Sequence, residues 1–150
     1  MRTANRVLGA LVALAVSFPL AGAVRAQPMN PAAKGYEVEW VYRVKYGSID
    51  EWWDIYRAYQ IPILDREVKL GYVLSYKIYH PQLHTDEAAR WDYRVEIVYK
   101  DFDGSLHEDA VAKTLFPDQA AQKAAENRRW SLTENHWDLP IYQVDTTKSR

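Results

Sequence analysis

The sequence contains no cysteine. This absence excludes disulfide bonds, thiol catalysis and zinc sites with cysteine ligands, and it also excludes a lipid anchor on an N-terminal cysteine. A chain of this kind has to be stabilised by packing alone. Six tryptophans and eleven tyrosines can supply that packing, because aromatic side chains bury large areas.

The sequence also lacks an apolar run long enough to cross a membrane. The longest run, at residues 7–20, has 14 residues, and a membrane-spanning helix needs about 20. Arg2 and Arg6 precede this run, and residues 24–26 follow it with the small-x-small pattern of a cleavage site. The pattern predicts a secretory signal peptide at residues 1–26, with an uncleaved anchor as the alternative. The mature protein would then be periplasmic or secreted, with no membrane segment.

Motifs that mark common catalytic and phosphate sites are missing as well. No G-x-S-x-G, G-x-x-x-x-G-K-[ST] or G-x-G-x-x-G occurs, so a nucleophile elbow and a phosphate-binding glycine loop lack support. Without residues 1–26 the chain has 16 basic against 20 acidic residues, a net charge of about −4. A nucleic-acid binder would carry a basic face, so we expect no nucleic-acid partner.

The sequence does contain a two-residue alternation in three segments. Between residues 36 and 46 every even position is aromatic or Val, and nearly every odd position is charged. Residues 72–79 and 90–100 alternate in a similar way. This period is typical of β-strands with unlike faces. The sides expected to face the core carry Tyr72, Leu74, Tyr76 and Ile78 in the second strand and Trp91, Tyr93, Val95, Ile97 and Tyr99 in the third.

A helix is predicted between the first two strands. Residues 48–51, Ser-Ile-Asp-Glu, match a capping box, in which the serine hydroxyl and the glutamate carboxylate bond to each other's backbone amides. Pro62 should interrupt the helix near residues 58–60, and Gly71 can end it. Its apolar face carries Trp52, Tyr56, Tyr59 and Ile63, a stripe that we interpret as core rather than as a cofactor site.

The second half of the chain predicts two further helices. Residues 108–115 favour a short helix, and Asp118 can cap an alanine-rich helix that runs to about Trp137. Pro140 would stop this helix, and residues 141–144 could form a short last strand.

The order strand, helix, strand, strand, helix, strand is that of a ferredoxin-like split βαβ fold. We therefore predict an α+β domain whose antiparallel sheet is covered by helices on one face. The domain would span residues 36–145, between a flexible tail at 27–35 and a second tail at 146–150.

The strand and helix patterns also resemble those of a known superfamily. The segments VEWVYRVKYG, SIDEWWDIYRAYQIPILDREVKLGYVLSYKIY and RWDYRVEIVYKDF are similar to the dimeric α/β-barrel superfamily, and more closely to its small exported bacterial proteins of unassigned activity. The resemblance spans residues 36–137, and residues 104–117 depart from the simple pattern. It implies a homodimer in which two sheets meet, with a cleft between sheet and helices. Members include monooxygenases, haem-handling enzymes, isomerases and binding proteins, so the fold alone does not choose a function.

The charged sides of the first and third strands can be compared in register, because these strands are antiparallel neighbours in this fold. The register we favour sets Arg43 opposite Glu96 and Val41 opposite Val98. A register slipped by two residues would set Arg43 opposite Arg94. This charged side has two interpretations: a solvated or dimer-forming surface, or the wall of a shielded cleft. In the second, the ligand-binding candidates are Arg43, Lys77, Arg94 and Glu96.

Histidines offer weak candidates for metal or haem binding. His80 and His84 lie four residues apart near acidic residues, but Pro81 indicates a loop rather than the helix that would align both rings, so we predict no metal site. His107 is expected at the surface. His136 is expected late in the last helix, and some superfamily members bind haem through a helical histidine. That match is by element and not by motif, so we predict no cofactor.

Three functions remain open from the sequence. The first is an exported homodimer that binds a small organic ligand in a sheet/helix cleft. The second is a cofactor-free enzyme of the dimeric α/β-barrel type, monooxygenase-like or isomerase-like. The third is a structural or interaction module. An acid and a base within hydrogen-bonding reach in the cleft would favour an enzyme over a binder.

Overall fold

The computed structural model describes residues 35–83, 86–142 and 144. The predicted signal peptide, residues 27–34 of the predicted N-terminal tail, the predicted C-terminal tail and His84 lie outside these residues.

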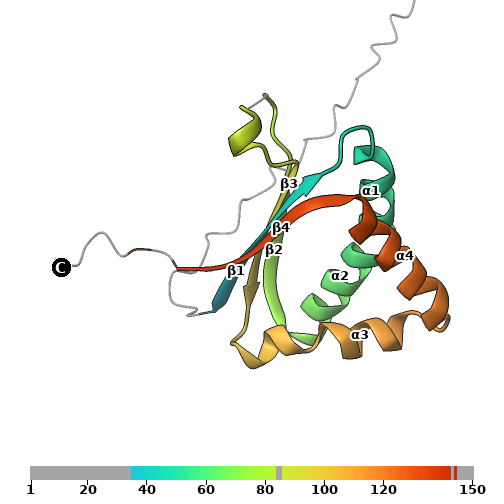
Figure 1. Ribbon diagram of the computed structural model, residues 1–150. Coiled ribbons are helices and arrows are strands. Elements are labelled where there is room, and N and C mark those ends of the chain that lie inside the picture. The colour runs from blue at the N-terminus through green and yellow to red at the C-terminus, as the bar shows by residue number, and fades with distance from the viewer. Residues whose placement is uncertain (1–34, 84–85, 143, 145–150) are drawn as a thin grey trace, which may run out of the picture. The chain divides into compact units, whose positions relative to one another are not determined.

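The described residues form one four-stranded sheet with helices on one side (Figure 1). The strand order is β2-β3-β1-β4, and every neighbouring pair is antiparallel. The predicted α+β, ferredoxin-like arrangement is therefore confirmed. In chain order the elements are β1 (Tyr36–Val44), α1 (Ile49–Ile55), the π-helix η1 (Tyr56–Gln60), α2 (Ile61–Leu70), β2 (Val73–Tyr79), η2 (Glu87–Ala89), β3 (Tyr93–Tyr99), η3 (Asp103–Leu106), α3 (Glu108–Leu115), α4 (Gln119–Leu132) and β4 (Thr133–Ile141).

Within the described part of the chain, no helix combines the length and apolar character that a membrane span requires.

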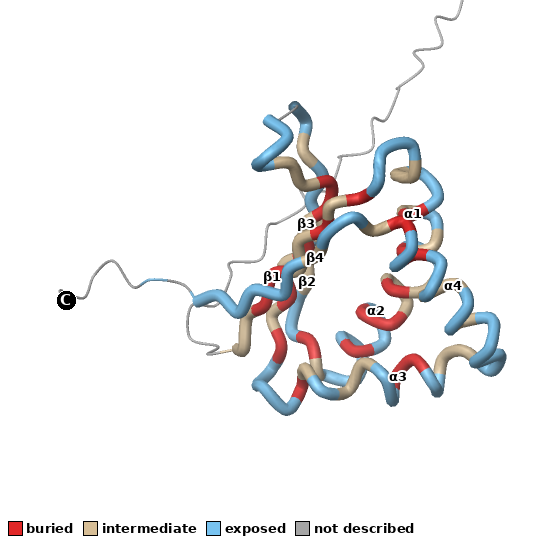
Figure 2. The backbone as a smooth tube through the Cα atoms, viewed as in Figure 1, coloured by how far each residue is buried: buried red, intermediate tan, exposed pale blue. Residues whose placement is uncertain are grey.

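The aromatic sides of β1 and β3 face the helices, as predicted. Tyr93 of β3 is buried, and its ring stacks on Trp52 and Trp53 of α1, each with 4.9 Å between centroids. The hydroxyl of Tyr76 of β2 donates to Asp65 of α2 at 2.7 Å. Buried residues accordingly gather where the sheet and the helices face each other (Figure 2).

The prediction that Trp91 shares this side is wrong. Trp91 lies before β3 begins, and the guanidinium of Arg94, which belongs to the open face, lies 5.3 Å from its ring centre.

The helical segment between β1 and β2 is continuous, and its middle is the π-helix η1. This interruption ends two residues before Pro62 and so lies where the sequence predicts it, because proline cannot donate a helical hydrogen bond to the preceding turn. The segment ends at Gly71, whose φ of 79° is left-handed, as the sequence also predicts.

The predicted capping box is not formed. The side chain of Ser48 makes no capping hydrogen bond, although its carbonyl accepts from the amide of Trp52 at 2.9 Å. The carboxylate of Glu51 instead accepts from Nε and Nη2 of Arg128 on α4, at 2.6 and 2.8 Å. A bidentate, charge-assisted contact is stronger than a bond to a backbone amide, so the contact between helices prevails over the local one.

Strand β2 begins with an irregularity. Its register with β3 shifts between Val73 and Ser75, so that Val73 enters the core while Leu74 remains 46% exposed. The prediction that Leu74 shares the core side with Tyr76 is therefore wrong, because the extra residue of a bulge reverses the alternation at that point.

The last helix is shorter and the last strand longer than predicted. α4 ends at Leu132, where Lys45 binds two of its final carbonyls: its amide donates to Leu132 O at 2.9 Å and its ammonium to Ser131 O at 2.7 Å. Pro140 lies within β4, which an edge strand tolerates. Nearly all of β4 is exposed, so its sequence shows no alternation that could have predicted a strand.

The register predicted between β1 and β3 is wrong. Glu39 lies opposite Glu96, and Arg43 is not adjacent to Glu96 but lies opposite Asn135 of β4. On the inner face this register pairs Tyr36 with Tyr99, so the packing of large rings sets it rather than charge.

Neighbouring strands relieve the like charges that this register brings together. Arg94 lies diagonally from Glu39 and forms an ion pair with it, with Nε 2.8 Å from Oε1. Glu96 accepts from the hydroxyl of Tyr79 at 2.8 Å and lies opposite Lys77 of β2. A comparison of directly opposite residues on β1 and β3 could include neither this diagonal ion pair nor the contacts from β2.

Candidate functional site

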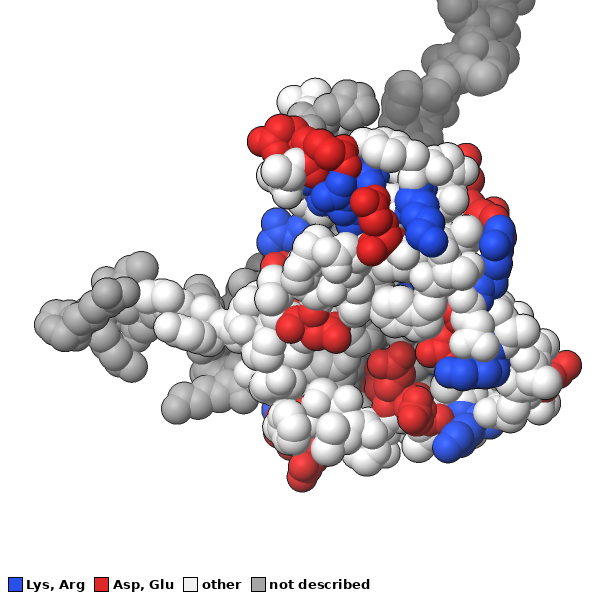
Figure 3. Space-filling view, viewed as in Figure 1, with Lys and Arg blue, Asp and Glu red and all other residues white. Residues whose placement is uncertain are grey.

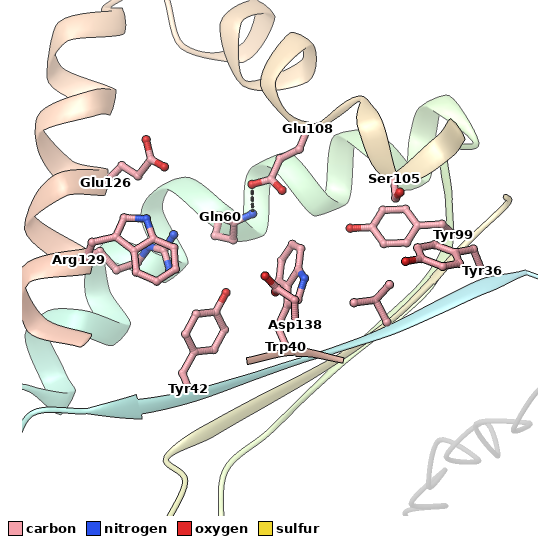
Figure 4. Close-up of a pocket in the computed structure, with 12 residues that line it drawn as sticks. Tyr36, Trp40, Tyr42, Gln60, Tyr99, Ser105, Glu108, Glu126, Arg129 and Asp138 are labelled. Atoms are coloured by element: carbon pink, nitrogen blue, oxygen red, sulfur yellow. Dashed lines mark hydrogen bonds between the residues drawn. The ribbon is translucent and has the colours of Figure 1, made fainter. Parts of the chain in front are cut away.

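A cavity of about 310 Å³ lies between the inner face of the sheet and the helices. The phenol oxygens of Tyr42 and Tyr99 point into it from the strands, and the carboxylate of Glu108 faces them from α3 (Figure 4). We call this space the sheet cavity. It is lined by Tyr36, Val38, Trp40, Tyr42, Gln60, Tyr99, Ser105, Glu108, Glu126, Arg129, Trp130 and Asp138.

A second cavity, of about 320 Å³, lies between the helices. Gln60, Glu108, Glu126 and Arg129 line both cavities, so the two spaces meet at these side chains. The most polar wall of the sheet cavity is therefore also the boundary between the two.

The π-helix brings Gln60 into this wall. Gln60, the last residue of η1, is buried, as is Tyr56 four residues before it. Its Nε2 donates to Oε1 of Glu108 at 2.8 Å. Burial raises the pKa of Glu108, while the bond from Gln60 and the charge of Arg129 act in the opposite direction.

Arg129 places a positive charge inside the aromatic wall. The residue is only 6% exposed, and its guanidinium lies 4.8 Å from the ring centre of Trp130 and 5.5 Å from that of Tyr56. Such cation–π contacts stabilise a cation without using its hydrogen-bond donors. Within the described residues, the buried Nη1 of Arg129 has no hydrogen-bond partner.

The acidic residues at the edge of the cavity each have a partner. Glu126 binds the ammonium of Lys123 at 3.0 Å, and Asp138 lies 2.9 Å from Nε2 of His136. The His136–Asp138 pair is a titratable acid and base within hydrogen-bonding reach, but only Asp138 lines the cavity.

A second buried carboxyl group lies behind the cavity wall. Glu67 of α2 is fully buried, and neither of its oxygens has a hydrogen-bond partner in the described residues. Burial, with a further contribution from the charge of Glu108, raises the pKa of Glu67 to about 7. Burial also raises the pKa of the Tyr42 and Tyr99 phenols, so both are neutral hydroxyls at physiological pH.

The four ligand-binding candidates predicted from sequence do not line either cavity. Lys77, Arg94 and Glu96 lie on the open face of the sheet, where Arg94 binds Glu39. Arg43 instead joins a cluster of ion pairs with Glu87 and Glu134, at the end of the sheet where charges of both signs gather (Figure 3). Ligand binding by these four residues stays a prediction.

The histidines have structural contacts. Nδ1 of His80 lies 2.8 Å from the carbonyl oxygen of Asp92, and the ring of His107 stacks on Tyr72 at 3.9 Å. The prediction that His136 lies in the last helix is wrong. It lies in β4, where its ring stacks on that of Tyr42 with 4.3 Å between the ring centres. Among the described residues, no three His, Asp or Glu side chains form a group that could hold a metal ion.

The sequence held a signal for one of the two residues that were missed. Glu67 lies four residues after the buried Ile63, so it continues the predicted apolar stripe. A charged residue on the buried face of an amphipathic helix is unusual and would have identified this position. Arg129 lies among small and polar residues of α4, which show no such apolar face.

Comparisons with known proteins agree with this fold. No family model matches the chain, and no curated protein matches it either. An uncharacterised NIPSNAP domain protein from Burkholderia xenovorans is similar in structure, with a TM-score of 0.50 and 13% identity over 75% of this chain and 98% of its own.

Two further solved structures are similar at lower scores. A dimeric ferredoxin-like protein from an uncultured marine organism has a TM-score of 0.49 and 7% identity, over 78% of this chain and 96% of its own. SnoaB, a cofactor-independent oxygenase from Streptomyces nogalater, has a TM-score of 0.41 and 14% identity, over 73% of this chain and 96% of its own. At identities this low, the likeness is one of fold alone.

Proposed function

We propose that this protein is a homodimer that binds a small organic molecule in the sheet cavity. The observation that carries the proposal is the cavity itself, about 310 Å³ of space with aromatic walls and a few polar groups that converge on it. Ligand sites commonly combine such a volume, from about 300 Å³, with apolar walls and a small number of placed polar groups. A purely structural or interaction module would need no such space.

The open face of the sheet supports the homodimer. Along β4, Trp137, Leu139 and Ile141 lie opposite Val41, Glu39 and Glu37 of β1 and are 36–42% exposed. This apolar row borders acidic and basic side chains on the neighbouring strands. A second copy, related by a twofold axis, could cover the row and pair charges of opposite sign, because each copy presents both signs.

Native mass spectrometry of protein purified from its own host tests the proposal. We expect the mass of a dimer that carries a bound small molecule. The variant Ser105→Phe should place a ring in the cavity and lose that molecule. Ser131→Phe is the matched control, because both hydroxyls donate to a carbonyl three residues earlier at 2.6 Å, while Ser131 lies outside the cavity. A dimer without any added mass would contradict ligand binding.

A cofactor-free enzyme is the second candidate, and Glu108 favours it. Burial raises the pKa of Glu108, and a buried carboxyl group with a raised pKa that lines a cavity is a candidate general acid or base. Glu108→Gln keeps the shape of the side chain and removes this ability. If the wild-type protein converts its host molecule, the variant should bind it and leave it unchanged. Equal conversion by both proteins would exclude Glu108 as the acid or base.

The proposal includes export, as the N-terminal pattern predicts. The protein recovered from the periplasm or the medium should begin at Gln27. An N-terminus at Met1 in membrane-bound material would contradict cleavage and favour an anchor.

A further inference from the structure

The charges around the sheet cavity are not balanced inside it. The lining carries Glu108, Glu126 and Asp138 but one basic residue, Arg129, which at first suggests a site for a cation. The contacts of these residues point to the opposite charge for the ligand. A ligand is favoured most by a buried charge that has no partner in the protein, because such a charge carries the largest desolvation cost.

Each acidic group of the lining already receives a hydrogen bond or forms an ion pair. Lys123 binds Glu126 at 3.0 Å, His136 lies 2.9 Å from Asp138, and Gln60 donates to Glu108 at 2.8 Å. Glu126 and Asp138 are also partly exposed to solvent, at 34% and 63% of their side chains, so water screens them further.

Arg129 differs in both respects. It is more than nine-tenths buried, and its Nη1 has no hydrogen-bond partner within the described residues. The guanidinium is always protonated, so it cannot relieve the cost of burial by losing its charge. An anionic oxygen brought into the cavity would supply the missing acceptor, and a hydrogen bond to a buried charged group is stronger than one between neutral groups.

The other side chains that line the cavity restrict the shape of the part of the ligand that carries the anionic group. Trp40 and Tyr42 project into the cavity from β1 (Figure 4). Trp130 of α4 lines it as well, with the guanidinium of Arg129 4.8 Å from its ring centre. Flat aromatic surfaces favour a planar ligand that can lie against them. The neutral phenols of Tyr42 and Tyr99 add two hydroxyl groups that can donate to oxygen atoms.

We propose that the ligand of the sheet cavity is a planar aromatic or conjugated molecule with a carboxylate or a similar anionic oxygen group, which binds Nη1 of Arg129. This inference rests on the proposed function and assigns the chemical class of the molecule. The anionic end would lie against α4, where both cavities meet, and the planar body would lie over β1.

Three small probes of one shape test the assignment. Benzoate, benzamide and benzamidine are all planar and alike in size, and they are anionic, neutral and cationic respectively. Isothermal titration of the mature protein should give the tightest binding for benzoate, by about tenfold or more over benzamide, as expected for one charge-assisted hydrogen bond. Benzamidine should bind more weakly than benzoate.

Two neighbouring arginines of α4 provide a matched pair of variants. Arg129→Met should lower the affinity for benzoate to that for benzamide, and Arg129→Lys, which keeps a positive charge, should retain part of the preference. Arg128→Met should leave the preference unchanged, because Arg128 binds Glu51 at the surface and does not line the cavity.

The wild-type protein alone can overturn the inference, so it does not depend on whether Arg129→Met folds. Equal affinities for the three probes, or tightest binding of benzamidine, would reject the anionic ligand and leave the proposed ligand cavity in place. Binding of none of them would also reject the inference, whereas the proposed function is decided separately by the native mass spectrum.

Discussion

Glu67 shows how one residue can make the stability of the whole domain depend on pH. Its carboxyl group is fully buried on α2, and burial raises its pKa from 4.5 to about 7. Between these two values the folded chain keeps a proton that the unfolded chain has lost. The free energy of unfolding therefore falls as pH rises through this window, and the contribution of the group is complete only below it.

Replacing Glu67 with Gln should remove this dependence. The variant should be more stable than the wild type at pH 8, by about 3 kcal/mol, and the difference should shrink as pH falls to about 5. Urea unfolding at several pH values measures it. Asp103→Asn is the control, since Asp103 is exposed and should shift no part of the curve. Parallel curves for wild type and Glu67→Gln would show that Glu67 does not hold the proton.

Single residues were also the hardest feature to predict from sequence. The alternation of the strands points to Arg43, Lys77, Arg94 and Glu96 as ligand contacts, because charged residues stand out on one side of a clear pattern. Arg129 lies in a helix whose remaining residues are mostly small or polar, so nothing local indicates that it is buried. The side chains that bury Arg129 belong to the sheet and to α1, which are distant in sequence. A local sequence pattern cannot show that they come together around it.

At the scale of elements, the junction of α4 and β4 depends on Thr133. Its Oγ1 accepts from Nε1 of the buried Trp52 at 2.9 Å and donates to the carbonyl of Arg129 at 3.0 Å. This residue therefore joins the end of the helix to the core at the point where the chain turns into the strand. The predicted helix ends at Trp137, five residues after Leu132, where α4 actually ends.

Thr133→Val should destabilise the protein by about 1–3 kcal/mol, because it leaves a buried indole N–H without an acceptor. The matched control is Thr114→Val in α3, where an exposed hydroxyl donates to the carbonyl of Ala110 at 3.0 Å and should cost about 0.5 kcal/mol or less. Chemical unfolding of both variants measures the difference. Equal losses would mean that the junction contributes no more than an ordinary surface threonine.

The elements themselves were predictable to a useful degree. The period of two identified β1 and β3, and Pro62 and Gly71 marked where the first helical segment is interrupted and where it ends. The register of β1 on β3 was not predictable from charge, because ring packing on the inner face and contacts from β2 and β4 outweigh it.

At the scale of the molecule, the proposed dimer places the exposed row of β4 in an interface. Leu139→Glu should put an acidic side chain opposite Glu39 and convert dimer to monomer in native mass spectrometry. Leu70→Glu on α2 is the matched control, because the two leucines are 42% and 44% exposed and only Leu139 lies on the open face. A monomeric wild type, or equal dissociation of both variants, would place the interface elsewhere.

The proposed function requires that the ligand binds in the sheet cavity and not on the open face of the sheet. Nuclear magnetic resonance of the six tryptophan indole N–H groups on addition of benzoate tests this requirement directly. We expect the signals of Trp40 and Trp130, which line the sheet cavity, to shift. Trp91, beside Arg94, and Trp137 on the open face should keep their positions. Shifts of Trp91 and Trp137 with Trp40 and Trp130 unchanged would place the ligand on the charged open face and contradict the account.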